Sequence, residues 1–272
     1  LSEIVVVSSN LAGVRYRQFA MAYYWGILEA NAFGHYRDLL EQVSKAPAMG
    51  AWLTYRGNRK ASGDNLPDEN YAREIMQLFS IGVYQLNLDG SLKLSNDKPI
   101  ETYNQTDVSQ LARVFTGWGL DPNQGTKDTP DASYHPMVQT AKYHESGTKV
   151  FLGTSIPANT DGETSLQLAL DTLMAHPNMA PFISRQLIQR LVTSNPDPSY
   201  VARVAAVFNN NGAGIKGDLA AVVRAILLDS AARSSARLSD VSFGKLREPM
   251  LRFLQWARTF GYRDAKDTWA IG

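Results

Sequence analysis

The sequence predicts a mainly α-helical globular protein with one small β-hairpin insertion and one long irregular segment. Apolar residues recur at helical spacing along most of the chain, one short stretch alternates instead, and residues 119–162 are rich in Pro, Gly, Asp and Thr with little periodicity. We interpret residues 1–272 as a single helical domain. We also expect it to be a fragment of a longer protein. The sequence begins at Leu1 without a methionine or a signal-peptide pattern, and it stops at Gly272 without a helix terminator.

The helices are predicted from periodicity and from their end signals. The first 60 residues are predicted to form two or three helices, with a turn at Gly34. The next helix should span residues 68–81, because Pro67 and Asp68 are typical of a helix start and Gly82 of a helix end. Further helices are predicted at about 105–118, 163–175, 178–193, 198–210, 217–229 and 243–260.

The β-hairpin is predicted at residues 84–94. Polar and apolar residues alternate on both sides of the pair Asp89-Gly90, which is a strong tight-turn signal. Such a hairpin projects from a helical body, and its exposed edge is able to pair with a strand of a partner.

The composition excludes several classes of protein. The 27 basic and 26 acidic side chains give a net charge of +1, and no basic block suggests a nucleic-acid or membrane surface. The chain has no cysteine, so it holds no disulfide, thiolate metal site or cysteine nucleophile. It also lacks a Gly-x-Ser-x-Gly elbow, a phosphate-binding loop and a dinucleotide fingerprint, which argues against nucleotide phosphoryl transfer and hydride transfer.

Glu74 is the most informative polar residue of the helix predicted at 68–81. At 100° per residue it falls beside Leu78, on the shoulder of the apolar face. A buried carboxylate must be paired or must have a raised pKa. Glu74 is therefore either a general acid or metal ligand, or one half of a structural ion pair or hydrogen bond.

Arg190 lies in the apolar stripe of its own predicted helix and should need a carboxylate partner. We expect Glu74 or Asp107 to supply it. Asp107 stands at a helix start, where capping is a more common role for a carboxylate than catalysis.

The four histidines form no paired metal-binding motif. His135 and His144 both lie in the irregular segment, and His144 is followed by Glu145 and Lys149. A mixed oxygen and imidazole site for a divalent metal is one alternative there, although the sequence identifies no metal or cofactor. Arg113 ends the preceding predicted helix and leads into this segment.

Several runs of sequence, in this order, resemble the bacterial family catalogued as domain of unknown function 1800. They are AFGHYRDLL at 32–40, PAM at 47–49, PDENYAREIMQLFSIG at 67–82, DVSQLARVFTGW at 107–118, HESGTKVFLG at 144–153, HPNMA at 176–180 and KLREP at 245–249. The resemblance implies an exported protein, located in the periplasm, at the cell surface or outside the cell. It also implies a partner from the sulfatase-like family catalogued as domain of unknown function 1501. The family often has His-Asp where this chain has His144-Glu145, and no catalytic mechanism comes with the resemblance.

Two functions remain open from the sequence. The first is an envelope or extracellular hydrolase that acts on a glycan or other surface polymer. Its candidate catalytic residues are Glu74 as acid or base, together with Asp107, Arg113, His144 and Lys149. The second is a structural or assembly component that associates with itself or with a partner, without catalysis.

Overall fold

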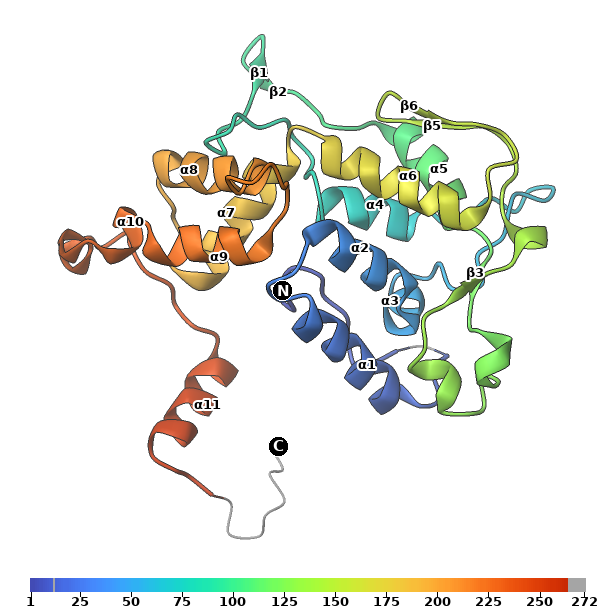
Figure 1. Ribbon diagram of the computed structural model, residues 1–272, viewed down its shortest axis with the longest axis horizontal. Helices are drawn as coiled ribbons and strands as arrows, with labels where there is room; N and C mark the ends of the chain where they lie inside the picture. Colours follow the sequence, from blue (N-terminus) through green and yellow to red (C-terminus); the bar gives the residue numbers. More distant parts are fainter. Residues whose placement is uncertain (12, 264–272) are drawn as a thin grey trace.

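The computed structural model describes residues 1–11 and 13–263, and its architecture is shown in Figure 1. Within these residues there are eleven α-helices and three small two-stranded sheets, which confirms the predicted mainly α class. In the described part of the chain, every helix is too short or too polar to cross a membrane. The interpretation as one domain of a longer protein stays a prediction.

The N-terminal third forms four helices around shared aromatic side chains. They are α1 (Arg17–Ala30), α2 (Tyr36–Lys45), α3 (Pro47–Trp52) and α4 (Asn70–Gln77). The ring of Tyr55 stacks on that of Tyr71 with 4.1 Å between centroids, and Phe115 meets Tyr71 edge-on at 4.7 Å. All three rings are buried, so they connect α4 to the segment that follows α5.

The predicted hairpin is present, and a third segment pairs with it. The turn at Asp89-Gly90 is closed by a hydrogen bond from Asn87 N to Ser91 O, and Leu86 is bridged to Leu92. A second turn joins β1 (Leu94–Ser95) to β2 (Lys98–Pro99), and the chain then returns to pair residues 100–102 with residues 83–85. Each of the three segments pairs with the other two, so the expected edge at 84–94 is paired in part within the chain, and strand addition by a partner there stays a prediction.

The helix predicted at 105–118 ends early. Helix α5 (Gln105–Ala112) is followed by a 3₁₀ turn η1 (Arg113–Phe115), and Trp118 already belongs to a strand. Gly117 separates the two with a φ of +83°, a left-handed conformation that stops a helix and that glycine adopts without strain.

The irregular segment carries two of the three sheets and little helix, as predicted. Strand β3 (Trp118–Gly119) pairs with β4 (Val138–Gln139), and β5 (Lys149–Phe151) pairs with β6 (Thr154–Ile156). The remaining regular turns are η2 (Pro122–Gln124), η3 (Asp131–Ser133) and η4 (Ala141–Tyr143). The strand β5 packs against α5, which fixes the end of this segment to the helical body.

The C-terminal part is helical, close to the predicted ranges. It contains α6 (Gly162–Ala175), α7 (Met179–Leu191), α8 (Pro198–Asn209), α9 (Leu219–Leu228), α10 (Ser230–Arg233), η5 (Ser235–Ser239) and α11 (Pro249–Thr259). Figure 1 shows α7, α8 and α9 side by side at one end of the molecule, with α11 set apart from them. Helix α11 starts later than predicted because Pro249 stands at its first turn.

The prediction that Arg190 pairs with Glu74 or Asp107 was wrong. Its guanidinium Nε lies 3.5 Å from the carboxylate of Glu3, and Lys245 contacts the same carboxylate at 3.5 Å. Neither Glu74 nor Asp107 takes part, because the end of α7 lies beside the N-terminal segment rather than beside α4 or α5.

Candidate functional site

A small polar cavity of about 210 Å³ lies where the irregular segment meets the start of α6. Its walls include Gln139 from β4, His144 and Ser146 from the turn after η4, and Asp161 and Gly162 from the start of α6. The lining residues all come from residues 139–162, where the chain folds back so that Gln139 of β4 lies against Gly162 at the start of α6.

His144 is the residue with the clearest chemical role in this cavity. Its Nδ1 lies 3.0 Å from the main-chain oxygen of Thr116, which only accepts hydrogen bonds, so Nδ1 carries the proton. Its Nε2 is buried and has no hydrogen-bond partner among the described residues. Burial lowers the pKa of His144, so the ring is neutral at pH 7 and Nε2 keeps a free lone pair.

Two other buried nitrogens near His144 also lack partners. Gln139 Nε2 and Trp118 Nε1 come from the paired strands β4 and β3, and with His144 Nε2 they make up three of the four such side-chain atoms in the described ranges. Buried polar atoms in native proteins almost always bind protein, water or ligand. Gln139 and His144 both line the cavity, so their two nitrogens favour a polar ligand at this place, whereas Trp118 does not line it.

Glycines let the backbone approach closely around the cavity. A Cβ on Gly117 would lie 2.7 Å from Gln139 Nε2 and 3.0 Å from the main-chain nitrogen of His144. A Cβ on Gly162 would lie 2.2 Å from Gln139 Cγ. No larger residue fits at either position without displacing a wall of the cavity.

Asp161 brings a carboxylate to the cavity, but its oxygens are already used. One accepts a hydrogen bond from Thr164 N and the other from Thr164 Oγ1, both at 2.8 Å, so Asp161 caps α6. These bonds lower the pKa of Asp161 and keep it ionised. Its charge favours the protonated form of His144 and partly offsets the effect of burial.

Arg113, Glu145 and Lys149 form a charged group behind His144. Arg113 donates to Thr148 O at 2.7 Å and lies 3.5 Å from the Glu145 carboxylate. Lys149 is fully buried, and its Nζ reaches only the oxygen of Gly147, at 3.5 Å. Burial lowers the pKa of Lys149, and the charge of Arg113 lowers it further.

Asp107 has the capping role that the sequence favoured. Its Oδ2 accepts from Asn104 N at 2.9 Å while Asn104 Oδ1 accepts from Asp107 N at 3.1 Å, forming a complete capping box. Its Oδ1 accepts from Leu152 N at 2.8 Å, which ties the turn after β5 to α5.

Glu74 is partly buried on α4, as predicted, and its carboxylate has no partner among the described residues. Burial raises the pKa of Glu74, while the charge of Arg73 opposes the rise. Arg73 itself is paired with Glu69. Of the five residues proposed from the sequence, only His144 lines the cavity, whereas Arg113 and Lys149 contact the segment behind it.

Sequence reasoning missed Gln139, Ser146 and Asp161. Only Asp161 carried a local signal, because an aspartate just before a predicted helix is a typical cap. The metal site considered at His144 gains no support, since no three His, Asp or Glu side chains gather suitably in the described part of the chain. His135 lies just after η3, and its Nδ1 forms a hydrogen bond with the main-chain oxygen of Asp131 instead.

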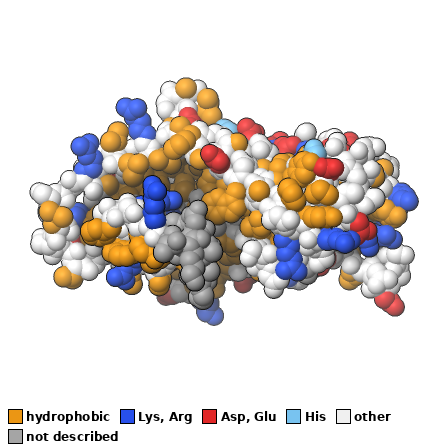
Figure 2. Space-filling view, turned by 90° about the horizontal axis from the view of Figure 1, so that it is seen from below, with side chains coloured by type: hydrophobic (Ala, Val, Ile, Leu, Met, Phe, Trp, Pro, Cys, Tyr) orange, Lys and Arg blue, Asp and Glu red, His pale blue; other side chains and the backbone are white. Residues whose placement is uncertain are grey.

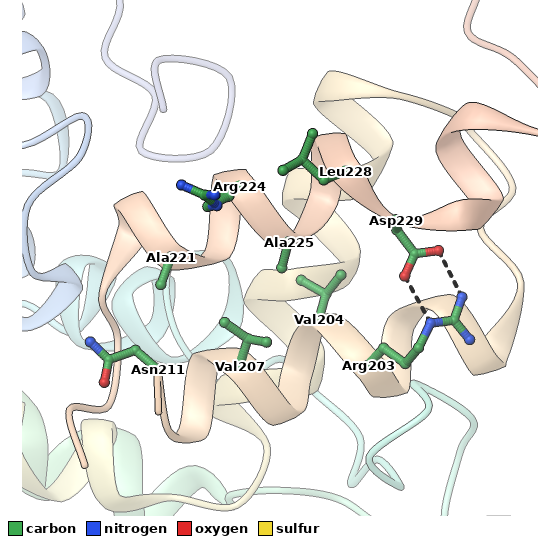
Figure 3. Close-up of a pocket in the computed structure, with 9 residues that line it drawn as sticks. All are labelled: Arg203, Val204, Val207, Asn211, Ala221, Arg224, Ala225, Leu228 and Asp229. Carbon is green, nitrogen blue, oxygen red and sulfur yellow. Dashed lines mark hydrogen bonds and ion pairs between the residues drawn. The ribbon is translucent and has the colours of Figure 1, made fainter. Parts of the chain in front are cut away.

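A second cavity of about 430 Å³ lies between α8 and α9. Figure 3 shows Val204 and Val207 of α8 facing Ala221 and Ala225 of α9. At its edge Arg203 forms a two-bond ion pair with Asp229, at 2.8 Å for each bond. This groove offers a surface for packing. Among the described residues, Asp229 is the carboxylate that lines it and is engaged by Arg203, while Arg224 lines it without an ion pair.

Comparison with known proteins identifies the family. No curated protein and no solved structure matches the chain. The model of the family described as Protein of unknown function (DUF1800) matches residues 1–271, which is essentially the whole chain. The chain therefore belongs to the DUF1800 family.

Proposed function

We propose that this protein is a hydrolase acting on a glycan or other surface polymer, with His144 as the general base that activates water. The observation that carries this proposal is that His144 lines the cavity with its Nδ1 bound to the Thr116 carbonyl and its Nε2 without a partner among the described residues. A neutral imidazole held in one tautomer by its second nitrogen is the form that a general base requires.

In the proposed reaction, Nε2 of His144 takes a proton from a water molecule as that water attacks a carbonyl carbon. The imidazolium that forms keeps its Nδ1–H bond to Thr116 O, and the ionised Asp161 stabilises its charge. The hydroxyl of Ser146, which lines the same cavity, helps to place the water. The His144 proton then passes to the leaving oxygen or nitrogen, which returns the base to its neutral form.

The cavity favours an ester or amide bond over a glycosidic bond. Most glycosidases use two carboxyl groups on either side of the bond they break. This cavity has one carboxylate, Asp161, and both of its oxygens are engaged in capping α6. The volume of about 210 Å³ suits a small acyl substituent of a polymer rather than several sugar rings.

The test is release of acid from acylated polymers. Purified protein is incubated with O-acetylated and N-acetylated polysaccharides, and free acetate is measured. We expect His144→Asn to lower the rate about 10²- to 10⁴-fold, the usual contribution of a general base. The matched control is His135→Asn, which lies outside the cavity and should retain the wild-type rate. A wild-type protein inactive on the whole panel, or a fully active His144→Asn variant, would refute the proposal.

The location and partner follow the family resemblance and are also proposals. We propose that the full-length protein is exported and that it associates with a sulfatase-like protein of the family of unknown function 1501. Fractionation of cells that express the full gene from its own start codon tests export, and co-purification under native conditions tests the partner. Recovery in the cytoplasm alone, or without the partner, would refute the corresponding statement.

An assembly role is the alternative, and the exposure of α11 favours it. Phe253, Trp256 and Phe260 have exposed fractions of 41%, 48% and 72%. Figure 2 shows hydrophobic side chains gathered around a hollow in the half of the molecule that contains α7–α11. Exposed apolar surface on this scale is typical of association, here with a second copy. Light scattering discriminates the two: a dimer that Trp256→Asp dissociates supports assembly, and a monomer at all concentrations excludes self-assembly.

A further inference from the structure

A cleft of about 570 Å³ lies on the other side of η4 from the His144 cavity. One wall is formed by residues 57–60, 62, 65 and 66, and the other by Lys142 and Tyr143 of η4. The neighbouring residues Ala141 and His144 line the smaller cavity instead. The short turn η4 therefore separates two sites.

Three cations line this cleft without a counter-charge. Arg59, Lys60 and Lys142 are exposed, and none forms an ion pair with a described residue. Among residues 1–11 and 13–263, no carboxylate lines the cleft. Asp64, in the adjacent turn, does not line it, and Asp68 is engaged by Thr54 and by the main chain of Asn70.

Contacts with Tyr143 hold the side chains of Arg59 and Lys142 and the main chain of Lys60 in position. The Arg59 guanidinium carbon lies 4.2 Å from the centre of the Tyr143 ring, and Lys142 Nζ lies 4.7 Å from the same centre. The pKa of the Tyr143 hydroxyl is lowered, first by a hydrogen bond and the positive charge of Lys142 and then by the charge of Arg59. The main chain is fixed too, since Lys60 N donates to Tyr143 O at 2.8 Å.

The same backbone also joins this cleft to the His144 site. Gly57 N donates to Trp118 O at 2.7 Å, and Gly117 N donates to Asn58 O at 2.8 Å. The segment 116–118, which supplies Thr116 O to His144, therefore also supports the wall that carries Arg59 and Lys60. A ligand in the cleft would lie on the far side of η4 from the base.

We infer that this cleft binds a phosphate or carboxylate group, either as a free anion or as the charged substituent of a saccharide. Arginine and lysine side chains with no protein counter-charge are the groups that bind such oxyanions. A saccharide as the carrier rests on the proposed function, because the charged group would then belong to the polymer whose acyl bond lies at His144. Oxyanion binding itself does not depend on that function.

A nucleic acid fits these observations less well. Its binding uses cations spread along a backbone and aromatic rings on which bases stack. Here the cations surround one cleft, the Tyr143 ring is already covered by Arg59 and Lys142, and the net charge is only +1.

Calorimetric titration tests the inference. The probes are inorganic phosphate, acetate, a tetrasaccharide of hexuronic acid and a neutral tetrasaccharide of the same length. We expect wild-type protein to bind phosphate or the acidic tetrasaccharide, but not the neutral one, with affinity that falls as salt rises. The double variant Arg59→Gln/Lys142→Gln should bind at least tenfold more weakly. The matched control Arg233→Gln/Lys127→Gln removes the same charges away from the cleft and should bind as wild type.

The outcomes distinguish a polymer substituent from a free anion as the ligand, and they test oxyanion binding separately from the proposed hydrolysis. Tighter binding of the acidic tetrasaccharide than of phosphate or acetate identifies the polymer as the source, and the reverse order identifies the free anion. His144→Asn should keep full oxyanion binding even where hydrolysis is lost, so the two proposals can fail separately. The inference is overturned if no anion binds, if the Arg59/Lys142 variant binds as wild type, or if a single-stranded oligonucleotide of equal charge binds more tightly than every other probe.

Discussion

The Nδ1 atom of His144 lies 3.0 Å from the main-chain oxygen of Thr116, twenty-eight residues earlier in the chain. Thr116 also accepts a hydrogen bond from Glu145 N through its hydroxyl, at 2.9 Å. The two contacts fix both the position and the tautomer of the imidazole. Because Thr116 is buried and Gly117 cannot accept a side chain, this relationship is a rigid part of the fold.

The first prediction concerns the protonation of His144. At pH 7 its ring should be neutral with the proton on Nδ1, and its pKa should be below the ordinary value of 6.5 because burial disfavours the cation. Nitrogen-15 NMR of labelled protein measures both properties. An Nε2-protonated ring, or a pKa above 6.5, would contradict the proposed role as a base.

The second prediction compares two glycines with nearly the same backbone conformation. Gly117 and Gly57 have φ values of +83° and +84°, but a Cβ would meet the cavity wall only at Gly117. Gly57→Ala should lower the free energy of unfolding by about 1 kcal/mol through strain, and Gly117→Ala by about 2 kcal/mol more through the clash. Urea denaturation measures the free energy of unfolding of both variants. Equal losses of stability would contradict the prediction, because they would show that the cavity wall shifts to accommodate the Cβ at residue 117.

The third prediction concerns the buried lysine. Lys149→Met should raise the free energy of unfolding at pH 7 by about 1 kcal/mol or more. The wild-type protein buries the ammonium group of Lys149 with one long hydrogen bond among the described residues, and an uncharged methionine avoids the cost of burying that charge. The folded pKa of Lys149 is lowered, so the unfolded chain binds more protons between that pKa and 10.5. The stability of wild type relative to Lys149→Met therefore rises with pH through this window.

Thermal unfolding from pH 7 to pH 10.5 measures the effect of Lys149→Met. Lys142→Met is the control, because Lys142 is exposed and its replacement should change stability by less than about 0.5 kcal/mol. A Lys149→Met variant that is less stable than wild type at pH 7 would mean that the ammonium group is paired more strongly than its 3.5 Å contact indicates.

The fourth prediction concerns Glu74. Burial raises its folded pKa, so the folded state binds more protons than the unfolded chain between the ordinary pKa and the raised one. The stability of wild type relative to Glu74→Gln should therefore fall as pH rises through that window. At pH 7 Glu74→Gln should be more stable by roughly 0.5 to 1 kcal/mol, and at pH 3 the two should be equal.

Chemical denaturation at pH 3 and pH 7 measures the Glu74 effect. The exposed residue Glu29 supplies the control, since Glu29→Gln should leave stability unchanged within about 0.5 kcal/mol at both pH values. A loss of stability in Glu74→Gln at pH 7 would reveal a partner for the Glu74 carboxylate, and so would favour the structural role considered from the sequence.

The sequence by itself determined the helices, the turn at Asp89-Gly90, the irregular segment at 119–162 and the family. These features depend on local properties: apolar spacing, helix-start and turn residues, and ordered runs of residues. The capping role of Asp107 and the partial burial of Glu74 were predictable for the same reason.

Only the tertiary structure decided which side chains meet. The pairing of β3 with β4 holds Thr116 close to His144, and a separate contact places Gln139 against Gly162 at the start of α6. No local pattern specifies either contact. The structure likewise pairs Arg190 with Glu3 and gathers Arg59, Lys60 and Lys142 around one cleft, although the sequence has no basic block. Contacts between distant segments depend on how the helices pack, and one sequence shows the faces of its helices but not their partners.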